Sequence, residues 1–218
     1  MKTVLCVFAH PDDEALGPSG TIAQLAKSHN IYLLCATKGE GQKSSSREKK
    51  ELAEIRKREL LRSAAILGVK KVFFLGYKDG HLCNTIYHSL AKKIQKKIEK
   101  LKPEILITFE PRGISGHTDH IVVSNVTSYV FEKIRYPSTL FYFCIDEKHR
   151  AQMKDYFIYF PPGYKKTEID KVVDVSNVWE QKVASMKAHK TQEKDVEMIL
   201  SWYSNLPKEE YFLVKAHK

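Results

Sequence analysis

A histidine and three carboxylates lie within one short segment near the start of the chain, at residues 9–14 (AHPDDE). The segment directly follows an apolar run over 4–8, which is typical of a buried strand. Pro11 disfavours helical torsions at His10, so we expect this imidazole at the end of that strand. Ligands bind at the carboxyl ends of strands in open α/β sheets, and clustered charges there need a partner. A divalent metal ion is a natural partner for this set.

A second segment that could bind a metal is GHTDH at residues 116–120, which follows a strand-like run over 104–109. Residues 111–113 break that run, and His120 begins the apolar pattern of a helix. His117 and His120 are three residues apart and would share one face of that helix. Each motif alone also fits a simple turn or a helix cap. Together they predict that His and Asp side chains meet at two strand-end loops.

The two motifs resemble those of the LmbE-like or PIG-L-like N-acetylglucosaminyl deacetylases, which carry AHPDDE early and HxDH later. The similarity continues in the family's order through the segments TKGEG at 37–41, RKREL at 56–60, LGV at 67–69 and LGYKDG at 75–80, and then through Lys182, His189 and Gln192. Ordered matches over residues 3–192 arise by chance much less readily than isolated motifs do. The resemblance implies a metal-dependent enzyme that removes an N-acetyl group from an amino sugar.

Three side chains of the motifs are candidate metal ligands. His10, Asp13 and His120 form a set of two imidazoles and one carboxylate. Such a set leaves positions open on a hydrolytic zinc ion for water and for a substrate carbonyl. It also suits Fe(II), so the ligand types alone leave the choice of metal open. We expect Glu14 to lie behind these ligands. The resemblance implies the same ligand positions.

The remaining motif residues are candidates for acid–base chemistry. Asp12 should point away from its neighbour Asp13 and can act as the general base that activates water. His117 can stabilise the oxyanion or protonate the leaving amine, and we expect Asp119 to hold its ring. A purely structural role is the alternative for His117. The resemblance implies the same catalytic roles.

The resemblance also implies two substrate-binding residues, Arg56 and Asp79. A carboxylate accepts two hydrogen bonds, so Asp79 suits sugar hydroxyls, while Arg56 suits a hydroxyl, phosphate or carboxylate group. The alternative for Arg56 is a charge on a helix surface. Helix capping is as plausible as substrate contact for Lys182, His189 and Gln192, so we expect these three outside the site.

Strand-like and helix-like stretches alternate along the chain, as a parallel sheet with crossover helices requires. We expect strands over 3–9, 31–37, 71–75, 104–109 and 139–145, helices over 15–28, 47–67, 85–101, 118–134 and 176–189, and further strand-like pieces over 156–160, 169–174 and 211–214. The pattern predicts an α/β fold: a Rossmann-like three-layer sandwich with a mostly parallel sheet, forming a single domain over residues 1–218. Segment 39–47 is a candidate for a mobile loop at the rim of the site.

The charge of the chain requires an explanation, because 36 Lys and Arg against 26 Asp and Glu give a net charge of +10. The basic run over 91–101 has the spacing of an amphipathic surface helix, and the run over 47–62 interleaves glutamates with its cations. Aromatic residues do not alternate with these cations as a single-strand binding platform would need. We therefore expect no nucleic-acid partner.

Other features of the sequence suggest a cytoplasmic enzyme. No apolar run is long enough to span a bilayer, and the N-terminal run has the pattern of a strand rather than of a signal peptide. Reduced thiols are expected for the widely spaced cysteines Cys6, Cys35, Cys83 and Cys144. The sequence is also compatible with a homo-oligomer.

The residues and the resemblance together predict a zinc-dependent amidohydrolase that releases acetate from an N-acetylglucosamine-type small molecule. One alternative is a metallohydrolase that acts on another amide or on a phosphoester. The other is a non-catalytic module that binds a metal or a sugar. Asp12 and His117 argue against such a module, because metal binding alone needs neither residue.

Overall fold

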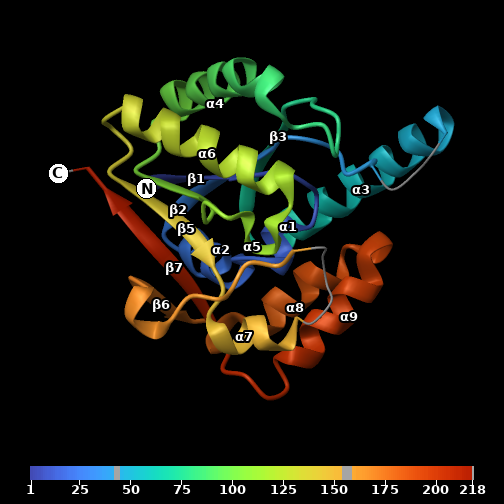
Figure 1. Cartoon of the computed structure of the whole chain (residues 1–218), viewed down its shortest axis with the longest axis vertical. Helices are drawn as coiled ribbons and strands as arrows, with labels where there is room; N and C mark the ends of the chain where they lie inside the picture. Colours follow the sequence, from blue (N-terminus) through green and yellow to red (C-terminus); the bar gives the residue numbers. More distant parts are fainter. Residues whose placement is uncertain (42–44, 154–158, 218) are drawn as a thin grey trace.

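The computed structural model describes residues 1–41, 45–153 and 159–217, and a seven-stranded sheet forms its centre (Figure 1). The strands are β1 (Lys2–Phe8), β2 (His29–Cys35), β3 (Val69–Phe74), β4 (Ile105–Phe109), β5 (Thr139–Cys144), β6 (Lys171–Asp174) and β7 (Glu209–Ala216). Their order is β3-β2-β1-β4-β5-β7-β6. β1 to β5 are parallel, whereas β7 runs antiparallel to both β5 and β6. The expected mostly parallel α/β sheet is confirmed.

β1 lies inside the sheet, between β2 and β4. Its residues 4–8 are at most 1% exposed, which explains their unbroken apolar run, because a parallel strand is covered on both faces. Phe8 is in register with Cys35 at the end of β2. The two strands therefore end together, and the AHPDDE segment begins at the carboxyl edge of the sheet.

Helices cover both faces of the sheet. They are α1 (Asp13–Leu16), α2 (Ser19–Ala26), α3 (Ser46–Ile66), α4 (Tyr87–Leu101), α5 (Gly113–Gly116), α6 (Thr118–Lys133), α7 (Glu147–Gln152), α8 (Trp179–Lys187) and α9 (Glu193–Trp202). Figure 1 shows α4 and α6 on one side of the sheet and α2 and α8 on the other, which gives the three expected layers. No helix in the described parts of the chain has the length and apolarity that a bilayer span requires.

Several expected elements differ from those observed. The helix expected over 15–28 is two helices, α1 and α2, because Gly17 and Pro18 interrupt it. The short helices α5 and α7 and the helix α9 were not expected. Part of the strand expected over 156–160 and part of the rim segment 39–47 lie outside the described residues.

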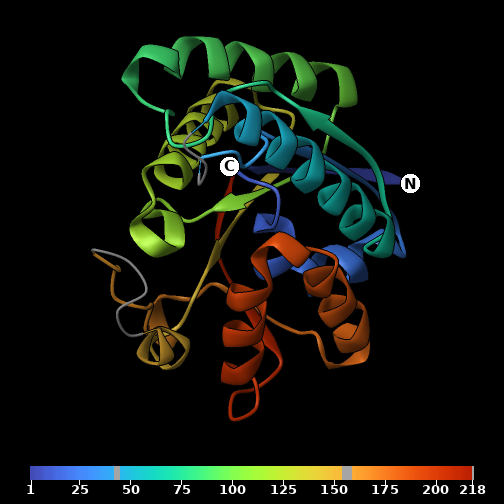
Figure 2. The same ribbon diagram turned by 90° about the vertical axis from the view of Figure 1, so that its right-hand side faces the viewer.

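A buried ion pair attaches the C-terminal part of the chain to the start of α2. Lys182 of α8, with no exposed surface, donates from Nζ to Glu210 Oε1 of β7 at 2.8 Å and to the carbonyl of Gly17 at 2.7 Å. The Glu210 carboxylate also accepts the backbone N–H groups of Gly20 and Thr21 in the first turn of α2. A carboxylate is favourable at a helix N-terminus. The cluster joins α8, β7 and α2, whose ribbons are orange, red and blue in Figure 2.

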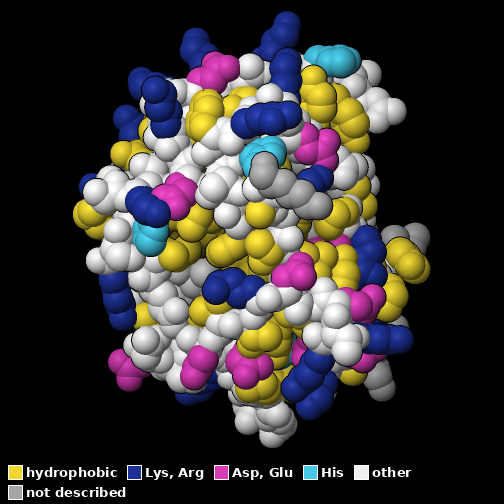
Figure 3. Space-filling view, turned by 90° about the vertical axis from the view of Figure 1, so that its left-hand side faces the viewer, with side chains coloured by type: hydrophobic (Ala, Val, Ile, Leu, Met, Phe, Trp, Pro, Cys, Tyr) yellow, Lys and Arg dark blue, Asp and Glu magenta, His cyan; other side chains and the backbone are white. Residues whose placement is uncertain are grey.

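The lysines of α4 form a surface face, as the amphipathic pattern predicts. Leu90, Ile94 and Ile98 are buried against the sheet, while Lys92 and Lys96 are exposed. Figure 3 shows Lys and Arg side chains at the top of the molecule, the end that α4 occupies in Figure 1. Much of the excess positive charge therefore lies on the surface.

The cysteines are free thiols, as expected. Cys6, Cys35 and Cys144 are buried in β1, β2 and β5, and burial raises the pKa of each of these thiols. Cys83 is exposed in the loop between β3 and α4. The three buried thiols thus serve as core side chains.

Candidate active site

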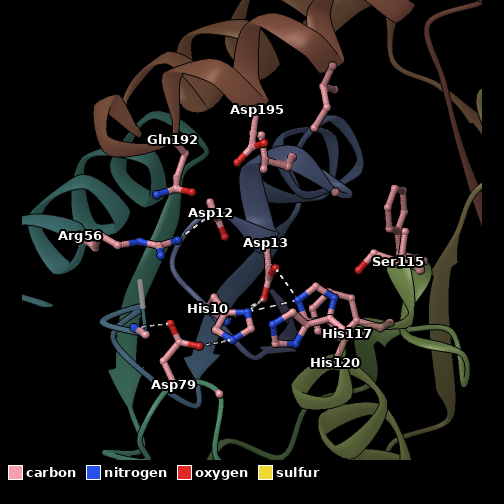
Figure 4. Close-up of a pocket in the computed structure, with 18 of the residues that line it drawn as sticks. His10, Asp12, Asp13, Arg56, Asp79, Ser115, His117, His120, Gln192 and Asp195 are labelled. Carbon is pink, nitrogen blue, oxygen red and sulfur yellow. Dashed lines mark hydrogen bonds and ion pairs between the residues drawn. The ribbon is translucent and has the colours of Figure 1, made fainter. Parts of the chain in front are cut away.

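A cavity of about 740 Å³ opens where the parallel strands end. Seven of the eight residues that the sequence assigned to the site line this cavity: His10, Asp12, Asp13, Arg56, Asp79, His117 and His120 (Figure 4). Asp119, the eighth, lies directly behind His10, with its Oδ2 3.2 Å from His10 Nε2. The segments that supply these side chains follow β1, β3 and β4 or belong to α3 and α6.

His10, Asp13 and His120 come together as one cluster. Their candidate ligand atoms all lie within 4.8 Å of one another. His120 Nε2 is 3.3 Å from Asp13 Oδ1 and 3.2 Å from His10 Nδ1. Two imidazoles and a carboxylate at this spacing fit a zinc or Fe(II) ion.

The atoms that face away from this cluster are held by other groups. His120 Nδ1 is 3.1 Å from the carbonyl oxygen of Gly113, so this nitrogen carries the proton and leaves Nε2 free to bind. His10 Nε2 lies 2.9 Å from Asp79 Oδ1 and 3.2 Å from Asp119 Oδ2. Two carboxylates therefore fix the His10 ring with Nδ1 toward the other ligands. Such support is typical of metal-binding histidines, and the donor set fits a divalent ion.

One carboxylate oxygen of Asp13 faces the cluster, and the other accepts hydrogen bonds from the backbone of the loop. Its Oδ2 accepts the backbone N–H groups of Ala9 at 3.0 Å and His10 at 2.7 Å. Burial alone would raise the pKa of Asp13, but His120 and His10 lower it to about 2. Asp13 is therefore ionised, as a ligand must be.

Asp12 lies beside the cluster in an unusual backbone conformation, with φ 118° and ψ −28°. Its Oδ2 accepts a hydrogen bond from Arg56 Nη2 at 2.8 Å, and its backbone N–H donates to Glu14 Oε2 at 3.1 Å. Burial raises the pKa of Asp12 to about 6, although Arg56 opposes the shift. A carboxylate with a pKa near neutrality is well matched to proton transfer.

Glu14 lies behind the candidate ligands, as expected, and joins three elements. Its Oε1 accepts hydrogen bonds from Ser63 Oγ at 2.5 Å and from His189 Nε2 at 2.7 Å. His189 has no exposed surface, and Glu14 is 1% exposed. The turn that carries Asp12 is therefore supported from α3 and from the end of α8.

Arg56 is a buried part of this turn and not a surface charge. The residue is only 4% exposed. Its guanidinium donates to the carbonyl oxygens of Pro11 at 2.6 Å and Gly39 at 2.9 Å, in addition to the carboxylate of Asp12. The surface-charge alternative is therefore wrong, and Arg56 positions Asp12 as well as lining the cavity.

The carboxylate of Asp119 is placed differently from the expectation that it holds the His117 ring. It accepts from His10 Nε2 and from the backbone N–H groups of Gly80 at 2.8 Å and Leu82 at 3.1 Å. The bond between Asp119 and His117 instead runs from the Asp119 backbone N–H to His117 Nδ1, at 3.2 Å. The two backbone hydrogen bonds from the loop after β3 hold the Asp119 carboxylate next to His10. Burial and the nearby imidazoles of His120 and His10 lower the pKa of His117.

Asp79 joins His10 to the rim of the cavity. Besides the contact with His10, its Oδ2 accepts the backbone N–H of Gly41 at 2.8 Å. Burial opposes ionisation, but these contacts outweigh it and hold the pKa of Asp79 below its usual range. Asp79 therefore organises the site in addition to facing the cavity.

Part of the cavity lining differs from the prediction made from the motifs. Gln192 was placed outside the site, yet it lines the cavity and points into it (Figure 4). Asp195 and Ile199 of α9 line the same cavity. The apolar spacing of Val196 and Ile199 is a helical signal that could have indicated α9. Lys182 lies outside the cavity, as expected, and His189 lies behind Glu14.

The fold and this cluster define an α/β protein with a candidate metal centre and a buried carboxylate beside it. A family model described as "PIG-L: GlcNAc-PI de-N-acetylase" matches residues 5–131, which is more than half of the chain. The protein therefore belongs to the PIG-L family, as the motifs predict.

Known proteins with similar sequences carry deacetylase names. The chain is 28% identical over 228 residues to 1D-myo-inositol 2-acetamido-2-deoxy-alpha-D-glucopyranoside deacetylase of a Mycobacterium species (strain KMS), covering 87% of this chain and 73% of the relative. It is 31% identical over 200 residues to diacetylchitobiose deacetylase of Thermococcus kodakarensis, covering 88% and 70%. The structure of N,N'-diacetylchitobiose deacetylase from Pyrococcus horikoshii matches with a TM-score of 0.75 at 22% identity, covering 99% of this chain and 84% of that one. This last likeness concerns the fold.

Proposed function

We propose that the protein is a zinc-dependent N-deacetylase that converts an N-acetylglucosamine-type small molecule into the free amine and acetate. The observation that carries the proposal is the cluster of His10, Asp13 and His120 within 4.8 Å, with Asp12 lining the same cavity. The deacetylase names of the relatives support the same reaction. His10, Asp13 and His120 would hold the metal, and Fe(II) would suit the same ligands.

A bound zinc ion supplies Lewis acidity toward the acetamide carbonyl and makes water more acidic. Asp12 then acts as the general base that takes the proton from the attacking water, while Arg56 holds its carboxylate in place. His117 lines the cavity on the side of Asp13 and His120 and stabilises the oxyanion or protonates the leaving amine. Asp119 acts through His10, whose ring it orients.

One side of the cavity, which we call the polar side, suits a sugar. Asp79, Arg56 and Gln192 present a carboxylate, a guanidinium and an amide on one side of the cluster (Figure 4). Such groups bind hydroxylated molecules through paired hydrogen bonds. The expected partner is thus a small N-acetylated sugar or sugar conjugate. A cytoplasmic location and a homo-oligomer remain predictions, and the free buried thiols are consistent with the former.

The deciding experiment measures acetate release by the purified, zinc-loaded protein over a panel of N-acetylated sugars. Free N-acetylglucosamine, its glycosides and diacetylchitobiose form the panel, with a simple N-acetyl alkylamine and a phosphomonoester as the alternatives. We expect hydrolysis of at least one sugar and none of the phosphomonoester. Phosphate release without acetate release would overturn the proposal in favour of a phosphoesterase.

Asp79→Ala tests whether the polar side recognises the sugar. We expect kcat/KM to fall more for the sugar than for the simple amide, because only the sugar offers hydroxyls to this carboxylate. Asp174→Ala, a change at a site outside the cavity lining, serves as the control. An equal loss for both substrates would mean that Asp79 acts only by holding His10.

A further inference from the structure

One wall of the cavity is apolar, and nothing in the deacetylation of a plain sugar requires it. Its side chains are Leu16, Phe143, Met153, Phe160 and Ile199, which we call the apolar wall. Leu16 belongs to α1, Phe143 to the end of β5 and Ile199 to α9. Met153 directly follows α7, and Phe160 lies between α7 and β6. Phe109 lies beside them, with its ring stacked on that of His120 at 4.1 Å between centroids. Apolar surface therefore reaches the candidate metal ligands.

The part of the apolar wall formed by Phe160 lies on the side of the cluster opposite Arg56. Figure 4 shows Arg56, Gln192 and Asp79 on one side and Ser115 with His117 on the other. The helix α5, which carries Ser115, packs against the segment that carries Phe160: a Cβ added to Gly116 would lie 2.6 Å from the carbonyl oxygen of Tyr159 and 3.4 Å from Pro161. Phe160 thus adjoins the side of the cluster that carries Ser115 and His117.

Phe143 and α1 are also in close contact. A Cβ added to Gly17 would meet the Phe143 ring at 3.4 Å and the carbonyl oxygen of Asp13 at 2.6 Å. The aromatic ring therefore lies against the turn that carries a candidate ligand, and the absence of a side chain at Gly17 lets this turn close on the Asp13 carbonyl. Phe143, Met153, Phe160 and Ile199 are each at most 8% exposed, so they form a packed surface.

A plain N-acetyl sugar would leave this wall largely uncovered. The acetyl group offers a single methyl group, whereas a cavity of about 740 Å³ is of the size that holds a drug-sized ligand. Covering apolar surface is favourable by an amount that grows with its area. The wall therefore indicates a substrate with a further apolar part.

We propose that the substrate carries an alkyl or aromatic group that packs against the apolar wall while its sugar occupies the polar side. The proposal rests on the proposed deacetylase function and specifies its substrate class. The group can belong to the aglycone or to the N-acyl chain, since both are attached near the reacting amide. The same apolar chemistry would recognise either one.

Two substrate series test the proposal and distinguish the two sources. The first compares the methyl, butyl and octyl glycosides of N-acetylglucosamine, and the second compares acetyl, butanoyl and hexanoyl groups on the methyl glycoside of glucosamine. Release of the free amine is measured for each. We expect kcat/KM to rise at least about ten-fold from the smallest to the largest member of one series. Flat values in both series would overturn the apolar subsite.

The variant Met153→Gln makes one position of the wall polar with little change in side-chain volume. It should remove several-fold of the gain for the larger substrates, so that kcat/KM falls more for the octyl than for the methyl glycoside of N-acetylglucosamine. Met198→Gln makes the same change on α9 outside the cavity lining and should leave the whole series unchanged. Ile199→Thr tests the wall from a second element, should Met153→Gln disturb folding.

Binding measurements separate this proposal from the proposed function. If no sugar is hydrolysed, the deacetylase proposal fails, and calorimetry with the octyl and methyl glycosides then tests the wall alone. Tighter binding of the octyl glycoside, lost in Met153→Gln, would support the apolar subsite. Equal binding of both glycosides would overturn it.

Discussion

The two parts of the chain contribute to one cavity in different ways. The segments from the end of β1 through the start of α6 supply the histidines and carboxylates of the candidate metal cluster, which are held by hydrogen bonds to neighbouring backbone groups. The elements from β5 onward supply most of the apolar wall together with Gln192 and Asp195. The match to the family model ends at residue 131, before the second part begins. Under the proposed function, the first part would supply the groups for the reaction together with Asp79 and Arg56 for the sugar, and the second part would supply most of the apolar wall.

The largest expected effect is a difference in metal content between variants of two histidines, each of which contacts an aspartate. His120 Nε2 lies 3.3 Å from Asp13 Oδ1 in the first part, and His149 Nδ1 lies 2.7 Å from Asp146 Oδ1 in the second. His120→Ala should lose the bound metal and all activity above background, because it removes a proposed ligand. His149→Ala should keep about one metal ion per chain by elemental analysis. Equal metal content in both variants would contradict the division of roles.

A smaller but still large loss is expected from Asp12→Asn. The substitution keeps the shape of the side chain but removes its capacity to accept a proton. Turnover should fall about a hundred- to ten-thousand-fold, the usual contribution of a general base. Metal content should match that of the parent protein, since Asp12 is not among the proposed ligands. Near-normal turnover by the metal-replete variant would exclude Asp12 as the base.

The attachment of the second part can be tested through its buried ion pair. Lys182→Met should leave the Glu210 carboxylate buried without its cation and lower the free energy of unfolding by about 3–5 kcal/mol. Urea unfolding followed by circular dichroism measures this change. The double variant Lys182→Met/Glu210→Gln should recover part of the loss. A single variant as stable as the parent would mean that the pair contributes little to the attachment.

The smallest effect concerns the cap of α7, the helix that leads to Met153. The Asp146 side chain accepts the backbone N–H of His149, and although burial opposes it, the contacts with His149 lower the pKa of Asp146. A lowered folded-state pKa means that the carboxylate stabilises the fold above the unfolded-state value, near pH 4, and loses this effect as the pH falls.

Asp146→Asn should therefore cost about 1 kcal/mol or less at pH 6 and still less near pH 3. Thermal unfolding of parent and variant across this pH range provides the measurement. A difference between the two proteins that grows as the pH falls would contradict the sign of the pKa shift.

The sequence predicted the first part of the molecule better than the second, for a physical reason. The buried run over 4–8 and the Pro11 that follows it determine the end of β1 locally, so the position of His10 could be inferred. The direction of the Asp119 carboxylate depends instead on Gly80, which is 39 residues away in the chain. Local patterns carry no information about such a contact.

The lining from α9 was missed for a similar reason. Gln192 and Asp195 reach the cavity only because α9 returns to the carboxyl edge of the sheet, which depends on the packing of α8 and α9. A short amphipathic helix gives a weak signal of its own existence and none of its location. Motif spacing therefore indicated the candidate ligands but not the walls of the cavity.

Asp79 makes the rim of the cavity and the candidate metal centre thermodynamically dependent on each other. One of its oxygens contacts His10 Nε2 and the other accepts the backbone N–H of Gly41. A ligand that favours this position of Gly41 also favours the orientation of His10 that suits metal binding. Linkage requires the effect to be equal in both directions, so a metal ion on His10 should strengthen the binding of such a ligand by the same factor.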